Sequence, residues 1–355
     1  FAPSGRVLHV VGVGAEQAGV IQSFARDPSI GVLAKLGEVS SAGLGPSHAA
    51  VDPAGHHLLV VNLRSDQVCS FPLSAAGLPA TPSMCLHTGA RPHQARFSPD
   101  GRFVFVPNRD DASVSRLRFD ANTGALAPDD VGGAPLRTEA RPRHLVFHPS
   151  GQAAYLVHEG GALVVSYRYD EASGVLSAPE LASTRHGGGA HVVVSPDGRF
   201  LYASARTAPS ALYVYALDAT TLRPAEIQRY ADPAIAVPRD FDVDPAGRHL
   251  VVGSQEHRSV VQLRLDPESG RIAGSPRVSL ARGGAAFVAT SPVDERPSLA
   301  GAIDLHGHTG PDVSPRTLDD VGLAERARAE GMRAIVLKNH VTITSDRAAL
   351  AMRVV

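Results

Sequence analysis

The segment that decides the fold is residues 140–176, which read ARPRHLVFHPSGQAAYLVHEGGALVVSYRYDEASGVL. An apolar stretch runs to a Pro-Ser-Gly turn, a second stretch returns from it, and a third alternates apolar and polar residues before a Gly-containing hairpin. Short runs rich in Val, Leu and Tyr that are bounded by turn residues are typical of antiparallel strands. The segment therefore predicts three consecutive strands of a meander, with a weaker fourth strand after the hairpin.

The same arrangement recurs along most of the chain, about 48 residues apart on average. Pro-x-Gly turns begin at Pro3, Pro53, Pro99, Pro149, Pro196 and Pro245. Four strands in a unit of roughly 40–50 residues are the signature of a β-propeller blade. A parallel solenoid is the alternative, but its repeats are shorter. We therefore predict six four-stranded blades around a channel, followed by one lone strand near residues 285–291.

The repeat is incomplete at both ends. After Pro292 the sequence VDERPSLAG replaces the expected turn, and Phe1 lies almost at the first turn, so the first blade lacks its first strand. An open ring would leave the edges of its sheets unpaired. We therefore expect that about one blade of chain is missing upstream of Phe1.

The composition of the 355 residues excludes several classes of protein. Hydrophobic residues make up 43% and charged residues 19%, which is enough apolar material for a core and argues against general disorder. The net charge of −1 favours neither nucleic acid nor an anionic membrane as a partner. No apolar run approaches the roughly 18 residues of a spanning helix. Cys69 and Cys85 are the only cysteines, and one pair does not settle the redox compartment.

The phase of the repeat brings polar residues to one rim of the channel. Residues about six before each turn proline and ten after it return to the same face, because the first strand runs to the turn and the second runs back. The ionisable residues on that rim are His93, Arg109, Arg143, Glu159, Arg206 and Arg239. Several guanidiniums and a carboxylate suit an anionic substrate, and a His or Glu beside them can move a proton.

Histidines also follow the rim position by one residue, at His48, His144 and His191. Their alternative role is to cap or pack the first strand of each blade. Residues 1–290 contain no His/Asp/Glu cluster at metal-ligand spacing, no Gly-rich phosphate loop and no Ser elbow motif. We therefore predict no cofactor and no metal site in the propeller.

Four segments resemble the lactonase family of seven-bladed propellers, which includes propeller-type 6-phosphogluconolactonases and carboxy-muconate lactonizing enzymes. These segments are GARPHQARFSPDGRFVFVPNRD (89–110), ARPRHLVFHPSGQAAYLVHE (140–159), HVVVSPDGRFLYASAR (191–206) and VPRDFDVDPAGRHLVVGSQEH (237–257). The resemblance covers about residues 1–290. It implies a seven-bladed-type propeller, here N-terminally incomplete, and metal-independent chemistry on a lactone ring that bears anionic groups.

The resemblance also implies site residues. The family's proposed site uses a His, then an Arg and a Glu sixteen residues apart, then a further Arg, and the matching positions here are His93, Arg143, Glu159 and Arg206. We expect these four to be catalytic, with Glu159 or His93 deprotonating the attacking water. The expected substrate-binding residues are Arg109, Arg239 and His144. One departure is His158, which stands where the family often shows Asn before the Glu.

The function implied is hydrolysis of an anionic sugar lactone in the pentose phosphate pathway. We expect a cytoplasmic monomer that binds this small substrate and no other partner. A second enzyme reading is lactone formation or opening on a carboxy-muconate. A reading of another class is a non-catalytic propeller that presents its rim to a ligand or protein. The rim shows few of the exposed aromatic residues that are enriched at protein interfaces, which favours the enzyme.

Residues 301–355 break the periodicity, and we treat residues 291–300 as a linker to a separate segment. The segment predicts strands near 301–306 and 333–338 around a helix near 317–330. It resembles the start of a metal-dependent amidohydrolase-like barrel, in which His306, His308 and His340 would be ligands. The segment supplies about two of the eight βα units of such a barrel. We therefore expect no competent metal site there. This counts against the third hypothesis, in which this segment carries the activity of the protein.

Overall fold

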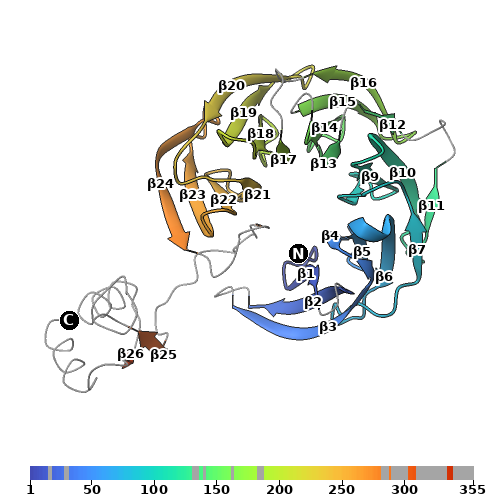
Figure 1. The fold of residues 1–355 in the computed structure, drawn as a ribbon, viewed down its shortest axis with the longest axis horizontal. Coiled ribbons are helices and arrows are strands. Elements are labelled where there is room, and N and C mark those ends of the chain that lie inside the picture. The colour runs from blue at the N-terminus through green and yellow to red at the C-terminus, as the bar shows by residue number, and fades with distance from the viewer. Residues whose placement is uncertain are drawn as a thin grey trace, which may run out of the picture. The chain divides into compact units, whose positions relative to one another are not determined.

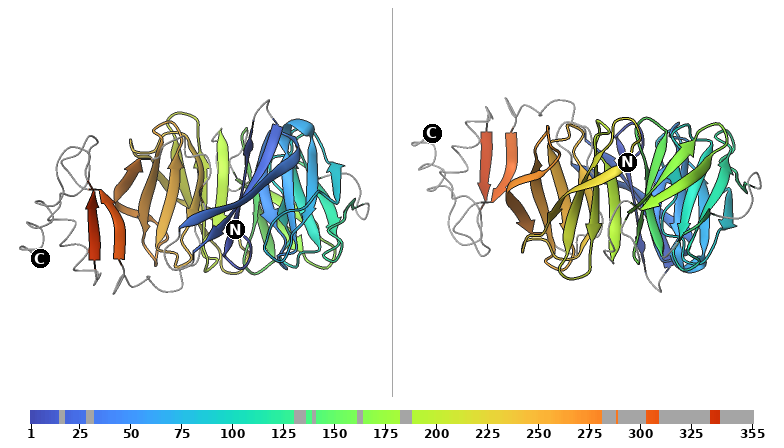
Figure 2. Two further views of the ribbon diagram at one scale, coloured as in Figure 1. Left: turned by 90° about the horizontal axis from the view of Figure 1, so that it is seen from below. Right: turned by 90° about the horizontal axis from the view of Figure 1, so that it is seen from above.

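The computed structural model describes residues 1–14, 18–27, 32–129, 136–138, 141–160, 164–181, 188–280, 288, 303–308 and 334–338. The chain divides into two compact units, Phe1–Pro292 and Val293–Val355. In the first unit, antiparallel sheets stand around a common centre, with the first strand of each sheet innermost and the last at the periphery (Figure 1). Seen from the edge, the strands run across the thickness of the ring (Figure 2).

The first unit contains six sheets. The first three are β1 (Val7–Val13), β2 (Ala18–Arg26) and β3 (Leu33–Leu44); β4 (Pro46–Val51), β5 (His57–Asn62), β6 (Gln67–Pro72) and β7 (Met84–His87); and β8 (Arg96–Phe97), β9 (Phe103–Asn108), β10 (Ser113–Phe119), β11 (Leu126–Pro128) and β12 (Leu136–Arg137). The other three are β13 (Pro142–Phe147), β14 (Ala153–His158), β15 (Val164–Asp170) and β16 (Val175–Leu181); β17 (Gly189–Val194), β18 (Phe200–Ala205), β19 (Ala211–Leu217) and β20 (Pro224–Tyr230); and β21 (Pro238–Val243), β22 (His249–Ser254), β23 (Ser259–Leu265) and β24 (Ile272–Leu280).

The prediction of an all-β propeller with six blades is confirmed, the first blade lacks its first strand as expected, and the count of four strands is wrong for the third blade. The first sheet has three strands, because only six residues precede β1 and none of them forms a strand. The third sheet has five, because β12 pairs with β10 beside β11. Within the described residues, the only helix is the single 3-10 turn Leu63–Ser65. The lone strand expected near 285–291 lies outside the described residues, apart from Val288.

The Pro-x-Gly turns set the register of the two inner strands in each blade. In the fourth blade Phe147 lies opposite Ala154 at the turn, and Pro142 lies opposite His158 at the other end. The turn glycine, Gly151, has a φ of 70°, a left-handed conformation that glycine adopts without the steric penalty of a Cβ atom. Residues just before β13 and just after β14 are thereby returned to one end of the blade.

Each core cluster joins neighbouring blades. Tyr155 and Val157 of β14 pack with Leu201 of β18 and Tyr213 of β19 in one cluster. The buried Tyr155 hydroxyl donates to the carbonyl oxygen of Leu222 at 2.8 Å, so its polar end is satisfied across the same blade interface. Apolar contact between blades therefore holds the ring together.

Outer hairpin glycines pack against an aromatic ring of the preceding blade. A Cβ atom added at Gly270 would lie 2.4 Å from Phe200, and one added at Gly174 would lie 2.6 Å from Phe103. Gly270 also has a φ of 69°. The hairpin glycines that recur in the sequence thus serve the blade interface as well as the turn.

We expect Gly270→Ala to lower the free energy of unfolding by about 1–3 kcal/mol more than Gly274→Ala does, because overpacking of a tight site costs about that much. Gly274 is a matched control, since its φ is 75° and nothing lies within 4 Å of its added Cβ. Both variants carry the strain of a left-handed alanine, and only Gly270→Ala adds the clash with Phe200. Equal denaturant midpoints for the two variants would contradict this packing role.

Cys69 and Cys85 form a disulfide between β6 and β7. The two residues lie directly opposite each other in the register of these strands. A cross-link of this kind stabilises a fold mainly by restricting the unfolded chain.

In the second unit, β25 (Ile303–His308) pairs in parallel with β26 (Ala334–Lys338). The boundary after Pro292 falls inside the predicted linker 291–300. The predicted helix near 317–330, the side chains of His306 and His308, and His340 all lie outside what the structure describes. Among the described residues, no helix has the length and apolar character needed to cross a membrane.

Candidate active site

The rim forms where the inner strands of four successive blades end. Arg143 lies in β13, and Glu159 directly follows β14, at the end where Pro142 faces His158. Arg109 after β9 and Arg206 after β18 occupy the corresponding place in the neighbouring blades. Antiparallel pairing therefore brings residues from separate repeats to one end of the ring.

Glu159 lies at the centre of three guanidinium groups. Arg143 Nη1 donates to Glu159 Oε1 at 2.8 Å, and Arg206 Nη2 donates to the same oxygen at 2.8 Å. Arg109 Nε donates to Oε2 at 2.6 Å. Burial acts to raise the pKa of the Glu159 carboxyl, but Arg143 and Arg206 outweigh it and hold this pKa below its usual value. The Glu159 carboxylate is therefore ionised, and both of its oxygens accept hydrogen bonds from the arginines.

The rim holds more positive than negative charge. Arg143 is buried, and its Nε donates to the carbonyl oxygen of Ala190 at 2.8 Å. Burial, followed by the charges of Arg206 and Arg239, lowers the pKa of Arg143 to about 9. Burial and Arg206 likewise lower the pKa of Arg239. Three guanidiniums bound to Glu159, one of them also 3.9 Å from Asp110, together with the nearby Arg239 form a group that an anionic ligand would stabilise.

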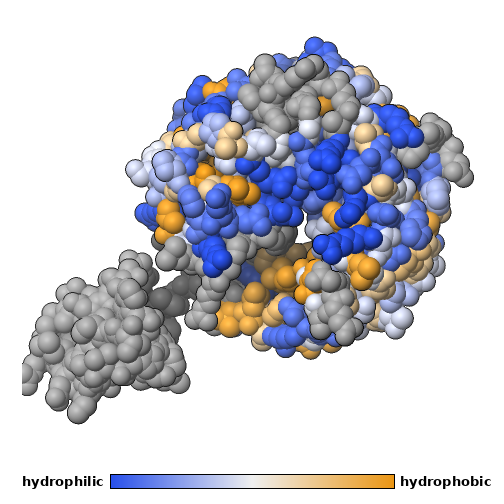
Figure 3. Space-filling model, in the orientation of Figure 1, coloured by the Kyte–Doolittle hydropathy of each residue, from blue (hydrophilic) through white to orange (hydrophobic). Residues whose placement is uncertain are grey.

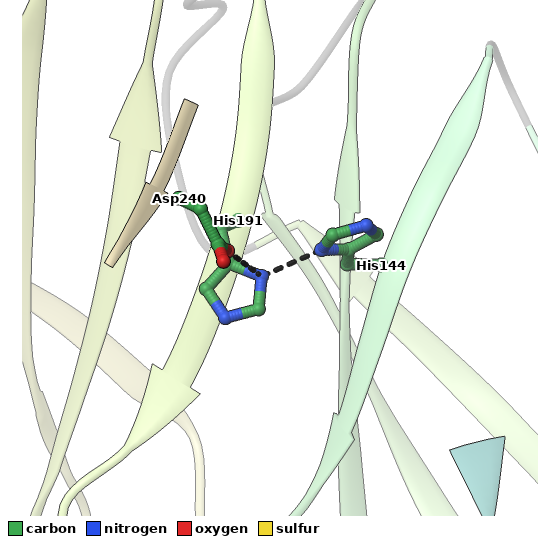
Figure 4. A group of neighbouring side chains, drawn as sticks. All are labelled: His144, His191 and Asp240. Carbon is green, nitrogen blue, oxygen red and sulfur yellow. Dashed lines mark hydrogen bonds and ion pairs between the residues drawn. The ribbon is translucent and has the colours of Figure 1, made fainter. Parts of the chain in front are cut away.

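A row of hydrogen-bonded histidines lies beside the arginines. His93 Nδ1 is 3.1 Å from His144 Nε2, and His144 Nδ1 is 2.5 Å from His191 Nδ1. His191 Nδ1 is 3.3 Å from Asp240 Oδ1 (Figure 4). Burial is the main cause that lowers the pKa of all three histidines, to about 3 for His191, and that raises the pKa of Asp240 to about 7. The three imidazoles are therefore neutral at pH 7.

Two residues of the row were not among the predicted site residues. For His191 the packing or capping role was left open as an alternative, and Asp240 was not selected, yet both side chains join the row. Their signal in the sequence is the position one residue after the rim position, which His144 also occupies. His158, the departure from the family pattern, is buried at the end of β14.

A cavity of about 680 Å³ runs along the channel on the other side of the row. His48, Gln94, His191 and Asp240 line it, together with apolar residues such as Leu145. It reaches the turn prolines, including Pro149, and its lining does not include Arg143 or Glu159. This cavity therefore reaches the turn end of the channel, away from Arg143 and Glu159.

Hydrophilic residues gather around the central opening on the face that Figure 3 shows, and hydrophobic surface appears on the side of β1–β3. Exposed apolar side chains of that sheet include Val10, Val13, Leu33, Leu36 and Leu44. The polar surface of the ring is thus concentrated toward its centre.

The fold is a β-propeller in which arginines from successive blades surround Glu159. Residues 1–286 match the model of the family described as "Lactonase, 7-bladed beta-propeller", and the chain belongs to that family. Six blades are described here, against seven in the family's description. Residues 301–355 match a family of unknown function, DUF6282.

Similar proteins include the 6-phosphogluconolactonase of Bacillus subtilis, 28% identical over 270 residues that cover 73% of this chain and 77% of that protein. The 6-phosphogluconolactonase of Cronobacter sakazakii is 28% identical over 262 residues, which cover 71% of this chain and 76% of that protein. Among solved structures, the periplasmic gluconolactonase PpgL of Pseudomonas aeruginosa superposes with a TM-score of 0.72 at 25% identity, covering 80% of this chain and 85% of that one.

Proposed function

We propose that this chain hydrolyses an anionic sugar lactone at the rim, as a lactonase of the 6-phosphogluconolactonase type. The observation that carries the proposal is the group of three arginines bound to Glu159, with Arg239 near them and a neutral histidine row beside them. Membership of the lactonase family and the names of the similar proteins support the same reaction.

The arginines are suited to two tasks. Arg109 and Arg239 supply charge for the phosphate or carboxylate of the substrate. Arg143 and Arg206 supply N–H donors for the lactone carbonyl oxygen, which becomes negatively charged when water attacks, and their charges also attract the substrate anion. Fixed donors aimed at developing charge in a site shielded from water are a major source of catalysis.

His93 is the better general base of the two candidates. Three guanidiniums keep Glu159 ionised and lower its basicity, so its proposed role is to hold the arginines in place. Burial and then Arg143 lower the pKa of His93 as well, so its advantage is geometric: its Nδ1 is engaged with His144 rather than with an arginine, which leaves Nε2 to accept a proton when Nδ1 carries the ring proton. In the proposed step, a water oxygen bonds to the carbonyl carbon while His93 takes its proton. The ring C–O bond then breaks, and the proton passes to the ring oxygen to give the hydroxy acid.

A panel of lactones tests the reaction class. Phosphorylated, carboxylated and neutral lactones, including a muconolactone, are incubated with the purified chain with and without a chelator, and acid release is followed. We expect hydrolysis of anionic sugar lactones that persists with chelator. Turnover of only the muconolactone would favour the lactonizing reaction, and binding without any turnover would favour the non-catalytic propeller.

Glu159→Gln separates anchoring from base catalysis. The amide keeps the shape but removes the charge that aligns three guanidiniums, so we expect kcat to fall by about 10-fold or more while an inert phosphorylated sugar acid binds at least as tightly. The control is Glu180→Gln, which removes a surface ion pair with Arg223. Unchanged kcat in Glu159→Gln would contradict the anchoring role.

The cytoplasmic location and the monomeric state stay predictions. The Cys69–Cys85 disulfide favours an oxidising compartment instead, because reducing compartments keep thiols reduced. One of the similar structures is named a periplasmic enzyme. Alkylation of the protein in intact cells, followed by counting of its free thiols, would decide between the two locations.

A further inference from the structure

We infer that His144, His191 and Asp240 bind a divalent transition-metal ion, for which zinc is the best match. These three residues come from β13, β17 and β21, the innermost strands of three successive blades (Figure 4). Their donor atoms all lie within 4.8 Å of one another. The inference revises the prediction of no metal in the propeller, and it does not rest on the proposed lactonase activity.

The two histidines present the same kind of nitrogen to each other. His144 Nδ1 and His191 Nδ1 approach to 2.5 Å, so the lone pair of at least one points at the other ring. Two neutral imidazoles in this arrangement need an electrophile between them, which is either one shared proton or a metal ion. A tetrahedral zinc ion at about 2.0–2.1 Å from each nitrogen would hold them roughly 3.3 Å apart and use both lone pairs.

Only one of the two carboxylate oxygens of Asp240 accepts a hydrogen bond from the described residues. Its Oδ2 accepts the backbone N–H of Val288 at 2.9 Å, which orients the carboxylate. Its Oδ1 is buried, accepts no hydrogen bond from the described residues, and faces His191 Nδ1 at 3.3 Å. A buried carboxylate oxygen without a donor is costly, and a metal ion at this point would satisfy it.

The surroundings have the features of a metal site. A ligating histidine usually engages its second nitrogen with a partner, and His144 does so through Nε2, which is 3.1 Å from His93 Nδ1. The Phe241 ring packs edge-on against His191 at 5.2 Å between centroids and limits its rotation. His191 and Asp240 line the channel cavity, which gives an ion a route of entry.

The ligand chemistry selects the type of ion. Two imidazoles and one carboxylate suit zinc with an open fourth position, whereas calcium and magnesium prefer oxygen ligands alone. Arg143 and Arg239 act on Asp240 electrostatically, Arg96 acts on His191 from the same cavity, and all three oppose a cation. Asp242, which lines the same cavity, and Asp240 itself supply negative charge against them.

Zinc binding to the chelator-stripped chain, measured by calorimetry and by metal content after dialysis, tests the inference. All variants carry His306→Ala and His308→Ala, so that the C-terminal histidines do not contribute. We expect one zinc per chain and a loss of affinity of at least about 10-fold in Asp240→Asn. Asp242→Asn is the comparison variant, because it removes the same charge from the same strand and cavity without removing a ligand, and its affinity should fall less than that of Asp240→Asn.

A second readout does not depend on the folding of a variant. Cobalt added to the stripped parent protein should give the visible absorption of a four-coordinate site, and zinc should raise its Tm because a ligand of the native state stabilises it. Absence of stoichiometric zinc in the parent, or equal affinity in Asp240→Asn and Asp242→Asn, would overturn the inference. These measurements contain no lactone, so a failure of the lactonase assays leaves them unaffected, and their failure leaves the lactonase proposal standing. A metal on His144 Nδ1 would place the proton of that ring on Nε2, where it donates to His93 Nδ1 and leaves His93 Nε2 protonated. The base role of His93 therefore belongs to the metal-free chain, the state in which the lactones are assayed with chelator.

Discussion

His93→Gln is expected to lower kcat for an anionic lactone by about 10²–10⁴-fold, the usual effect of removing a general base. His93 is buried and held by His144, and glutamine keeps much of its volume and polarity without a nitrogen that accepts a proton. KM should stay within a few-fold, because the charges of Arg143 and Arg206 remain. Steady-state rates on the phosphorylated lactone measure both constants.

His48→Gln is the control for this variant. The His48 ring lies edge-on to His144, with 6.1 Å between ring centroids, and it lines the channel cavity. It belongs neither to the arginine group nor to the hydrogen-bonded row. Equal loss of activity in His48→Gln and His93→Gln would point to general disturbance of the channel, and the assignment of the base would fail.

Arg143→Ala is expected to lower kcat/KM by about 10²–10³-fold, the effect of losing one oxyanion donor, with a further loss specific to anionic substrates. The change removes a charge that the substrate anion would otherwise pair with, and the unpaired charge has a cost of its own. The ratio of kcat/KM for a phosphorylated and a neutral lactone separates the two effects. An unchanged ratio would show that Arg143 does not recognise the anion.

The free energy of unfolding provides a second check on Arg143→Ala. Arg143 Nε donates to the carbonyl oxygen of Ala190, so truncation leaves a buried acceptor unpaired, at a cost of about 1–3 kcal/mol in the free energy of unfolding. Arg143→Lys restores a positive charge but not the planar pair of donors. We therefore expect it to recover preference for the anionic lactone more than it recovers kcat.

Much of the fold could be predicted because the turns recur in the sequence. A Pro-x-Gly turn fixes where two inner strands meet, and its spacing gives the number of blades. The extra strand β12 could not be predicted in this way, because it has two residues and pairs with β10 outside the repeating order. Short edge strands depend on local backbone pairing, which leaves little trace in hydrophobic periodicity.

The candidate site was predictable in its position along the strands but not in its side-chain partners. Repeat phase placed Arg143 and Glu159 at the same end of a blade, and the pairing of Pro142 with His158 gives the physical reason. The phase of the repeat does not indicate toward which neighbouring blade a side chain is oriented. For this reason the capture of Glu159 by three arginines and the contact of His191 with Asp240, residues of different repeats, emerged only in three dimensions.

The rate of 6-phosphogluconolactone hydrolysis by the purified chain, compared with gluconolactone and with the buffer reaction, tests the central claim most directly. The account predicts a rate proportional to protein concentration, with kcat/KM at least about 10-fold higher for the phosphorylated lactone because the rim carries more positive than negative charge. The same rate should fall toward the buffer reaction in His93→Gln. Hydrolysis no faster than in buffer, or full activity in that variant, would contradict a lactonase site at the rim.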